Sequence, residues 1–260
     1  MVKIFIMTDL EGPAGVNRWI QTREGETPEK AAAMRLLTAE VNAAIEGIHL
    51  SAPDADVIVY DGHGTGGLVF EELSPRAQVI MHGVGMKLPC NLDPTYDALC
   101  FVGQHAMAGT PNAPLCHTYS SRRIEHYKLN GRCIGEIGCL AALAGNMGVP
   151  TIFLSGDDKA CAEAAALQPQ METVPTKQGL GIELALHLSA YRARQAIRDG
   201  AARAIQLLPT IAPVRIPPPY ELEIRVLEGC SIATYLQSGM EPLDERTVLR
   251  RSEDLLALFA

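Results

Sequence analysis

A strand–helix–strand order at the start of the chain limits the possible folds more than any other feature. Residues 2–7 (VKIFIM) are a short apolar run that ends in a polar loop, which predicts a buried strand. Residues 27–29 (TPE) are a helix-start signal, and apolar residues at helical spacing predict a helix from there to about Gly47. Residues 56–60 (DVIVY) predict a second buried strand. Two strands joined through a helix form a βαβ unit, so we expect a parallel sheet.

The same alternation continues through the first two-thirds of the chain. Further strands are expected at residues 78–81, 98–102 and 151–154, and helices at 136–144 and 158–167. Residues 124–133 contain Asn130-Gly131, which is a strong hairpin signal. The sequence therefore predicts an α/β fold with a mostly parallel sheet flanked by helices.

The last third of the sequence has a different pattern. Residues 182–208 are expected to be helical, with Ser189 as an internal boundary. The proline-rich residues 209–219 are expected to form a connector to the strands that follow. Strands are expected at 221–227 and 245–250, followed by a short helix after residues 252–254. We therefore expect a break near residues 175–185, which gives an α/β metal-site domain at 1–180 and a smaller α+β C-terminal region at 181–260.

Composition and charge exclude some classes of function. The chain has 260 residues, 47% of them hydrophobic, which fits a folded protein. Its net charge of −8 argues against nucleic-acid and anionic-membrane partners. Gly145, Asn146 and Pro150 interrupt the charge-free stretch 137–156, so a membrane span is not expected there. The first residues lack a signal-peptide pattern, and the seven cysteines include no CxxC, so we expect reduced thiols and a cytoplasmic location.

Polar side chains follow several of the predicted strands. In open α/β sheets, ligands bind outside the carboxyl ends of the strands, so these positions are the first places to search. The strand ends carry Asp9, Glu11, Asp61, His63, His105, Asp157 and Asp158, and Glu136 opens the helix after the hairpin. Carboxylates and imidazoles gathered at one sheet edge indicate a metal site, and zinc suits this set of donors.

Five of these residues are the strongest metal-ligand candidates: Asp9, Glu11, His63, His105 and Glu136. Five ligands exceed the need of one tetrahedral zinc, whereas two ions about 3.5–4 Å apart with a bridging carboxylate would use them all. Asp9 is the natural bridge because it is short and lies close to the strand end. Such a pair lowers the pKa of bound water and so makes hydroxide available near neutral pH.

Each candidate also has an ordinary structural interpretation. Asp9 is a common turn residue, and Glu11 beside a glycine can be solvated. His63 can be exposed in its glycine-rich loop, and His105 can be a hydrogen-bonded core residue. Glu136 suits a helix start through the helix dipole, as Asp157 and Asp158 suit helix caps. The convergence of several residues on one sheet edge, rather than any single residue, supports the metal site.

His117 lies apart, in a loop before the hairpin. Beside metal ions it could act as a general acid or base, or donate to a developing oxyanion. The alternative is a surface loop histidine. Neighbouring side chains of an extended chain point in opposite directions, which argues against a dyad with Cys116. The loop 62–67 (GHGTGG) lacks the Gly-Lys-Ser/Thr ending of a phosphate-binding Walker A loop.

Seven short blocks in order resemble those of the zinc-dependent D-aminopeptidases. Residues 8–12 (TDLEG) resemble the end of the family signature S-x-D-x-E-G, and residues 61–63 (DGH) resemble D-S-H. Residues 103–106 (GQHA) resemble G-Y-H-A, and residues 116–118 (CHT) resemble S-H-S. The other similar blocks are 130–138 (NGRCIGEIG), 156–160 (GDDKA) and 176–178 (TKQ). The resemblance covers residues 1 to 180.

This resemblance implies two zinc ions held by Asp9, Glu11, His63, His105 and Glu136, with Asp9 bridging and His117 as the catalytic histidine. It also implies a small-peptide substrate and a homodecamer of two stacked pentameric rings. The chain departs from the family pattern at Met7, Gly62 and Gln104, where the signature has Ser, Ser and Tyr. None of the three is an implied ligand, but all are expected near the pocket, where they would affect the preference for D-residues.

The sequence therefore predicts a binuclear zinc aminopeptidase that acts on short peptides or amides with N-terminal D-amino acids. One alternative is a magnesium-dependent phosphohydrolase of the haloacid-dehalogenase type, although that family uses D-x-D where this chain has Glu11 as the second acid. Another alternative is a non-catalytic metal-binding scaffold protein.

Overall fold

The computed structural model describes residues 1–23, 25–81 and 88–259, and its largest element is a seven-stranded sheet, here called sheet A. The strand order is β3-β2-β1-β4-β7-β8-β9, parallel throughout except for the antiparallel pair β8–β9. The strands are β1 (Lys3–Thr8), β2 (Asp56–Asp61), β3 (Gln78–Ile80), β4 (Ala98–Gln104), β7 (Thr151–Asp157), β8 (Glu172–Gly181) and β9 (Leu184–His187). The predicted α/β class with a mostly parallel sheet is confirmed.

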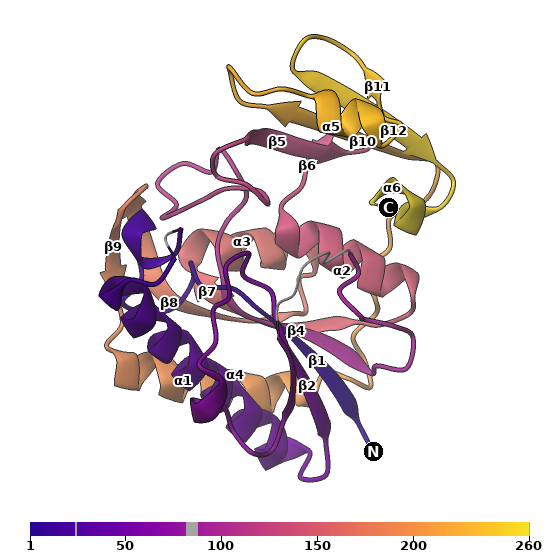
Figure 1. The fold of residues 1–260 in the computed structure, drawn as a ribbon. Coiled ribbons are helices and arrows are strands. Elements are labelled where there is room, and N and C mark those ends of the chain that lie inside the picture. Colours follow the sequence, from indigo (N-terminus) through magenta and orange to yellow (C-terminus); the bar gives the residue numbers. More distant parts are fainter. Residues whose placement is uncertain (24, 82–87, 260) are drawn as a thin grey trace.

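Helices cover both faces of sheet A (Figure 1). Helices α1 (Pro28–Ser51) and α4 (Ala190–Ile205) lie on one face, while α2 (Glu136–Asn146) and α3 (Asp158–Leu167) lie on the other. Residues 4–7 of β1 are all apolar because both faces of the strand are buried. Ile4 and Ile6 pack with α1 and α4, and Phe5 packs with α2. A strand that is buried on both faces needs apolar residues at every position.

Helix α1 begins as expected but ends later. The hydroxyl of Thr27 accepts a hydrogen bond from the backbone N–H of Lys30, and Pro28 is the first helical residue. The helix runs to Ser51 rather than to about Gly47. Gly47 is a contact point with α4, because a Cβ atom there would lie 2.1 Å from the carbonyl oxygen of Arg198. This glycine therefore allows close packing of two helices and does not end the first one.

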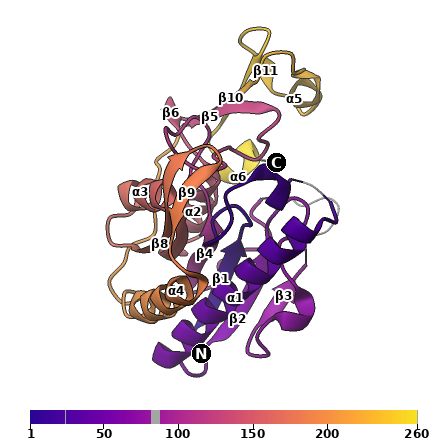
Figure 2. The same ribbon diagram turned by 90° about the vertical axis from the view of Figure 1, so that its left-hand side faces the viewer.

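A second, antiparallel sheet of five strands, called sheet B, has the order β11-β12-β10-β5-β6 among the described residues. Figures 1 and 2 show sheet B stacked at one end of the larger body, on the side of α2. The predicted hairpin at 124–133 is confirmed as β5 and β6. The elements are β5 (Ile124–Leu129), β6 (Arg132–Cys133), β10 (Tyr220–Val226), α5 (Ala233–Gln237), β11 (Glu241–Pro242), β12 (Thr247–Ser252) and α6 (Leu255–Leu258), and single-turn 3₁₀ helices lie at η1 (Trp19–Gln21) and η2 (Phe70–Glu72).

The expected helix at 182–208 is wrong in its first part. Residues Leu184–His187 form strand β9, and the helix starts only at Ala190, after Ser189 accepts a hydrogen bond from the Arg192 N–H. Leu184 and Leu186 are spaced by two and are both exposed, so they suit an edge strand better than a buried helix face. Over so short a stretch, hydrophobic periodicity does not distinguish a strand from a helix.

The division into domains at 1–180 and 181–260 stays a prediction. The assignment of strands to sheets A and B does not follow a boundary at residue 180. Strand β9 and helix α4 belong with sheet A, although both follow residue 180. The hairpin β5–β6 belongs with the C-terminal strands, although it precedes that residue. The chain therefore leaves sheet A after β4, enters sheet B, and returns for α2 and β7. Among the described helices, none is both long and apolar enough to cross a membrane.

Candidate metal centre

The candidate site lies where β1 and β4 end side by side. From β1 the chain passes to α1 on one face of sheet A, and from β4 it goes on to α2 on the other face, which creates a crevice at the carboxyl ends. The two loops touch: the Asp9 N–H donates to Val102 O (3.0 Å) and the Gly12 N–H to Gly103 O (2.7 Å). A Cβ atom at Gly12 would lie 2.2 Å from the Gly103 carbonyl carbon, so only glycine fits there.

One half of the site joins Asp9, Glu11 and His63. The Nδ1 atom of His63 lies 3.0 Å from Asp9 Oδ1 and 3.1 Å from Glu11 Oε2. The other ring nitrogen, Nε2, lies 3.0 Å from the carbonyl oxygen of Thr22, which fixes the orientation of the ring. A carbonyl behind a metal-ligating histidine is the usual arrangement, because it holds the proton away from the nitrogen that faces the ion.

The other half joins Asp9, His105 and Glu136. The Nε2 atom of His105 lies 3.2 Å from Asp9 Oδ2 and 3.5 Å from Glu136 Oε1. Its Nδ1 atom lies 2.9 Å from the carbonyl oxygen of Ala106. The two oxygens of Asp9 thus face two different histidines, as expected of a carboxylate that bridges two ions.

The carboxylates and imidazoles of the site shift one another's pKa values. Burial alone would raise the pKa values of Asp9 and Glu136, but their histidine partners lower both below the usual carboxylate range. Burial would lower the pKa values of His63 and His105, but the carboxylates raise both well above the usual imidazole value. Without metal, the protonated histidines and the ionised carboxylates attract one another. A divalent cation could replace these protons and attract the same carboxylates.

The donor set fits a metal on a second observation. Asp9 Oδ2, Glu11 Oε2 and His105 Nε2 are buried, and their contacts at 3.1 and 3.2 Å with the neighbouring charged groups do not have the geometry of hydrogen bonds. Ligand atoms of Asp9, Glu11 and His105 all lie within 4.8 Å of one another, as do those of His105, His117 and Glu136. Buried polar atoms without well-formed hydrogen bonds are costly, so a ligand is expected to satisfy them.

His117 lies directly beside this cluster, not on a remote surface loop. Its ring stacks on that of His105, with 4.0 Å between the centroids, and Trp19 contacts it from another side at 5.8 Å. The Nδ1 atom faces the carbonyl oxygen of Leu115 at 2.9 Å, and Nε2 lies 3.8 Å from Glu136 Oε1. Burial and the nearby His105 charge lower the pKa of His117.

Other strand-end carboxylates hold loops in place. Asp157 caps α3 through the N–H groups of Lys159 and Ala160, as the cap interpretation expected, and it also accepts from the Ala106 N–H. Asp61 Oδ1 accepts from the Gly67 N–H at 2.8 Å. Asp158 does not cap a helix but accepts from the Gly179 N–H at 2.8 Å.

Three contributors were not found from the sequence. Thr22 acts through its backbone carbonyl, which no side-chain motif reveals. Lys177 is buried in β8, and Tyr119 holds Glu136 through its N–H at 2.6 Å. The block at 176–178 marked the neighbourhood of Lys177, but an internal lysine in a strand gave no sign that its charge is buried.

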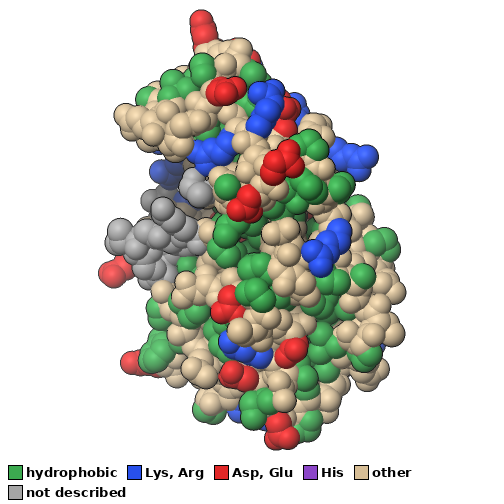
Figure 3. Space-filling view, turned by 90° about the vertical axis from the view of Figure 1, so that its right-hand side faces the viewer, with side chains coloured by type: hydrophobic (Ala, Val, Ile, Leu, Met, Phe, Trp, Pro, Cys, Tyr) green, Lys and Arg blue, Asp and Glu red, His purple; other side chains and the backbone are tan. Residues whose placement is uncertain are grey.

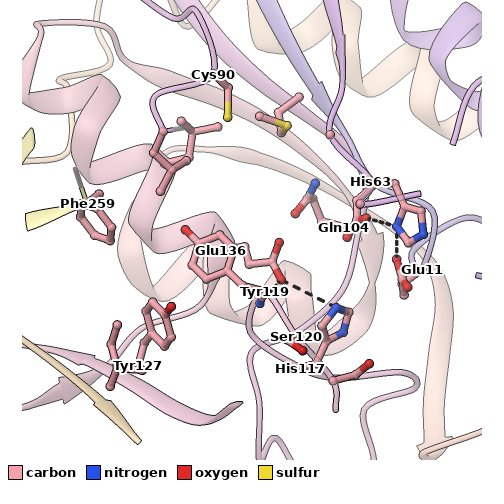
Figure 4. A pocket seen from close by; sticks show the side chains of 18 of the residues that line it. Glu11, His63, Cys90, Gln104, His117, Tyr119, Ser120, Tyr127, Glu136 and Phe259 are labelled. Carbon is pink, nitrogen blue, oxygen red and sulfur yellow. Dashed lines mark hydrogen bonds and ion pairs between the residues drawn. The ribbon is translucent and has the colours of Figure 1, made fainter. Parts of the chain in front are cut away.

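A cavity of about 590 Å³ opens from the metal centre (Figure 4). Figure 3 shows hydrophobic side chains reaching the surface where the sheet B layer meets the larger body. The departures Met7, Gly62 and Gln104 all line this cavity, as expected from the sequence. The volume lies within the range of small-molecule sites in proteins.

Comparison with known proteins agrees with this geometry. The family model described as D-aminopeptidase matches residues 2–260. The chain belongs to the D-aminopeptidase family. A D-aminopeptidase of Bacillus subtilis (strain 168) is 29% identical over 218 residues, which cover 83% of this chain and 78% of that protein.

A solved structure shares the whole fold. It is the Zn-dependent D-aminopeptidase DppA from Bacillus subtilis, described as a self-compartmentalizing protease. The two structures superpose with a TM-score of 0.90 and 27% identity, over 99% of this chain and 94% of the other. Membership of the family therefore extends to residues 181–260, beyond the part of the chain in which the motifs lie.

Proposed function

We propose that this chain is a binuclear zinc aminopeptidase that hydrolyses short peptides or amides, with a preference for N-terminal D-amino acids. The observation that carries the proposal is the position of Asp9, whose two oxygens lie 3.0 and 3.2 Å from nitrogens of two different histidines. Membership of the D-aminopeptidase family and the Zn-dependence of the similar structure support the same activity. Glu11 with His63 and Glu136 with His105 would complete the two ligand sets.

Zinc bound here would supply a Lewis acid for the scissile carbonyl and hydroxide near neutral pH. The protein contributes the remaining steps. Asp9 and the other ligand carboxylates hold the site in place, and one of these acidic side chains, such as Glu11, can bind the free amino terminus of the substrate. His117 has a lowered pKa and donates Nδ1–H to Leu115, which leaves Nε2 facing Glu136. This nitrogen can accept a proton from the attacking water and pass it to the leaving amine, and while it is protonated it can stabilise the developing oxyanion.

The test combines metal content with turnover. Protein purified without chelators is analysed by elemental mass spectrometry and assayed on D- and L-aminoacyl amides and dipeptides. We expect about two zinc ions per chain, as a two-metal site requires, with D-selective and chelator-sensitive turnover. Zinc without turnover on any amide would favour the scaffold alternative. Magnesium with turnover of phosphate esters would favour the phosphohydrolase.

The assembly belongs to the same proposal. We propose a homodecamer of two pentameric rings, supported by the similarity to a protease described as self-compartmentalizing. Strand β9 and the start of α4 expose Leu184, Leu186 and Tyr191 by 58%, 63% and 66%, and such a patch at a sheet edge is normally covered. Light scattering coupled to size exclusion gives the mass, and a monomer at micromolar concentration would contradict the proposal.

A cytoplasmic location is proposed on the state of the thiols. All seven cysteines are free, and four of them are buried. Fractionation of the source cells, followed by immunodetection of the chain, tests it.

A further inference from the structure

The cavity does not end at the metal centre. Beyond Glu136 it continues into a recess with apolar walls, called the apolar recess, whose side chains come from both layers of the molecule. Figure 4 shows His63 and Glu11 at one end of the cavity and Phe259 and Tyr127 at the other. The apolar recess is lined by Phe101, Tyr127, Leu140, Ile224, Met240 and Phe259.

The apolar recess shares a wall with the metal centre. The N–H of Tyr119 donates to Glu136 Oε1 at 2.6 Å, so Tyr119 is fixed to a candidate ligand. The ring of Tyr119 in turn lies 5.2 Å from that of Tyr127, measured between centroids. In Figure 4, Tyr119 and Glu136 lie between the histidines and Tyr127. A molecule whose amide is at the metal centre can therefore extend a side chain into the apolar recess.

Sheet B presents part of its apolar face to this space. In β10, Leu222, Ile224 and Val226 share the buried face, with exposures of 3% or less. Leu222 and Ile224 line the cavity, whereas Val226 is not among the described residues that do. These two side chains expose only a small part of their surface to the cavity, and an apolar ligand that covers this part of the wall is favoured because it displaces water from apolar surface.

The charges of the cavity are distributed unevenly. The carboxylates and imidazoles gather at the metal end, where Asp9, Glu11, His63 and Glu136 lie. Near the apolar recess, the guanidinium of Arg250 donates to the carbonyl oxygens of Ser238 and Leu258, which ties α6 to the segment after α5. A cationic substrate side chain in the apolar recess would lose water and meet apolar walls and the Arg250 guanidinium, which is unfavourable.

We propose that the apolar recess selects substrates with a large apolar or aromatic side chain on a residue that flanks the scissile bond. The inference rests on the proposed aminopeptidase activity and adds the substrate class. The enzyme should therefore prefer leucyl and phenylalanyl substrates over alanyl and glycyl ones.

The experiment measures the ratio of kcat/KM for phenylalanyl substrates to kcat/KM for alanyl substrates. For zinc-loaded protein, kcat/KM is determined for phenylalanyl and for alanyl amides and dipeptides of the productive configuration. We expect Ile224→Ala to lower the phenylalanyl-to-alanyl ratio by about tenfold, because a few lost methylene contacts have an effect of this size. Phe259→Ala, at a partly exposed position near the end of the chain, should change the ratio in the same direction.

Val226→Ala is the matched control. It removes an apolar side chain from the same face of the same strand, so it has a comparable cost in stability, but it lies outside the lining. Its ratio should stay within about twofold of wild type. An unchanged ratio in both Ile224→Ala and Phe259→Ala, or a wild-type preference for alanyl substrates, would overturn the proposal.

A binding titration separates this proposal from the proposed function. Zinc-loaded protein is titrated with phenylalaninamide and alaninamide by calorimetry. Tighter binding of phenylalaninamide than of alaninamide, abolished by Ile224→Ala, would support the apolar recess even if no amide is turned over. Such a result without turnover would contradict only the proposed aminopeptidase activity. Equal binding of the two amides, with turnover present, would keep the activity and reject the recess.

Discussion

The ammonium group of Lys177 donates a 2.5 Å hydrogen bond to the carbonyl oxygen of Glu11, inside the protein. The same ammonium donates to the carbonyl oxygens of Pro13 (3.3 Å) and Val16 (2.5 Å). Next to it, the hydroxyl of Thr176 donates to Gly12 O at 2.8 Å. Strand β8 therefore fixes the backbone of the loop that carries two candidate ligands, Asp9 and Glu11.

Replacing Lys177 with methionine should weaken metal binding. The methionine keeps most of the volume but leaves three carbonyl oxygens without their donor, so the ligand loop loses its anchor. We expect zinc affinity to fall by about 10–100-fold, the effect usual for groups that support ligands. Competition with a chromophoric chelator measures the affinity. Lys159→Met, at a partly exposed lysine bonded to Asp158, is the control and should bind zinc like wild type.

The bridging role of Asp9 predicts different zinc contents for two variants. Asp9→Ala removes an oxygen from both ligand sets, so it should lose both ions. Glu136→Ala touches only the His105 half and should keep about one ion at the His63 half. Elemental mass spectrometry after dialysis distinguishes the two, with Asp158→Asn as a carboxylate control outside the cluster. Retention of two ions by Asp9→Ala would rule out the bridge.

His117 should act on the reaction and not on the zinc content. Because its Nε2 faces the site, His117→Ala is expected to lower kcat by about 10²–10⁴-fold, the usual contribution of acid–base catalysis. His117→Phe is the sharper variant, since it keeps a ring to stack on His105 but has no nitrogen. Both should retain the wild-type zinc content. Full activity in His117→Phe would show that only the ring matters.

Zinc affinity should rise with pH. The pKa values of His63 and His105 are raised well above the usual value by Asp9, Glu11 and Glu136, so both imidazoles hold protons at neutral pH without metal. Zinc must displace those protons, and the competition weakens as the pH increases through the raised values. Calorimetry in two buffers of different ionisation enthalpy should show about one to two protons released per chain at pH 7. Absence of proton release would contradict these assignments.

Glu40 predicts a loss of stability as the pH rises. Burial raises its pKa to about 8 from 4.5, and the Ala14 N–H and Lys177 only partly offset this. Between these two values, the folded chain holds a proton that the unfolded chain has released, so the contribution of Glu40 to stability is greatest below pH 4.5 and is lost as the pH rises to 8. Glu40→Gln should lose less stability than wild type between pH 5 and 8, by an amount on the order of 2–4 kcal/mol. Urea unfolding with chelator present measures it.

Glu46→Gln is the control for this comparison, because it changes an exposed acid on the same helix. Its stability should follow the wild-type pH dependence. If Glu40→Gln does so as well, the buried carboxyl is not the cause.

Strand ends predicted which polar side chains come together, because their positions follow from sheet topology. Asp9 and His105 come together only because β1 and β4 are neighbours, and short apolar runs marked both strands. His117 could not be placed in the same way, since its position depends on a long loop that crosses to sheet B. Lys177 and the carbonyl of Thr22 were missed because their roles depend on tertiary contacts with the backbone, which leave no local pattern.

The path of the chain between its two sheets links the site to the smaller layer. His105 lies before the crossing, Glu136 lies directly after it, and His117 lies on the way. The only described neighbour of β5 besides its own hairpin partner is β10, from the C-terminal third. Local unfolding of sheet B would release the middle of this crossing segment, between His105 and Glu136. Loss of activity on heating should therefore precede global unfolding, and removal of the strands from Tyr220 onward should abolish activity.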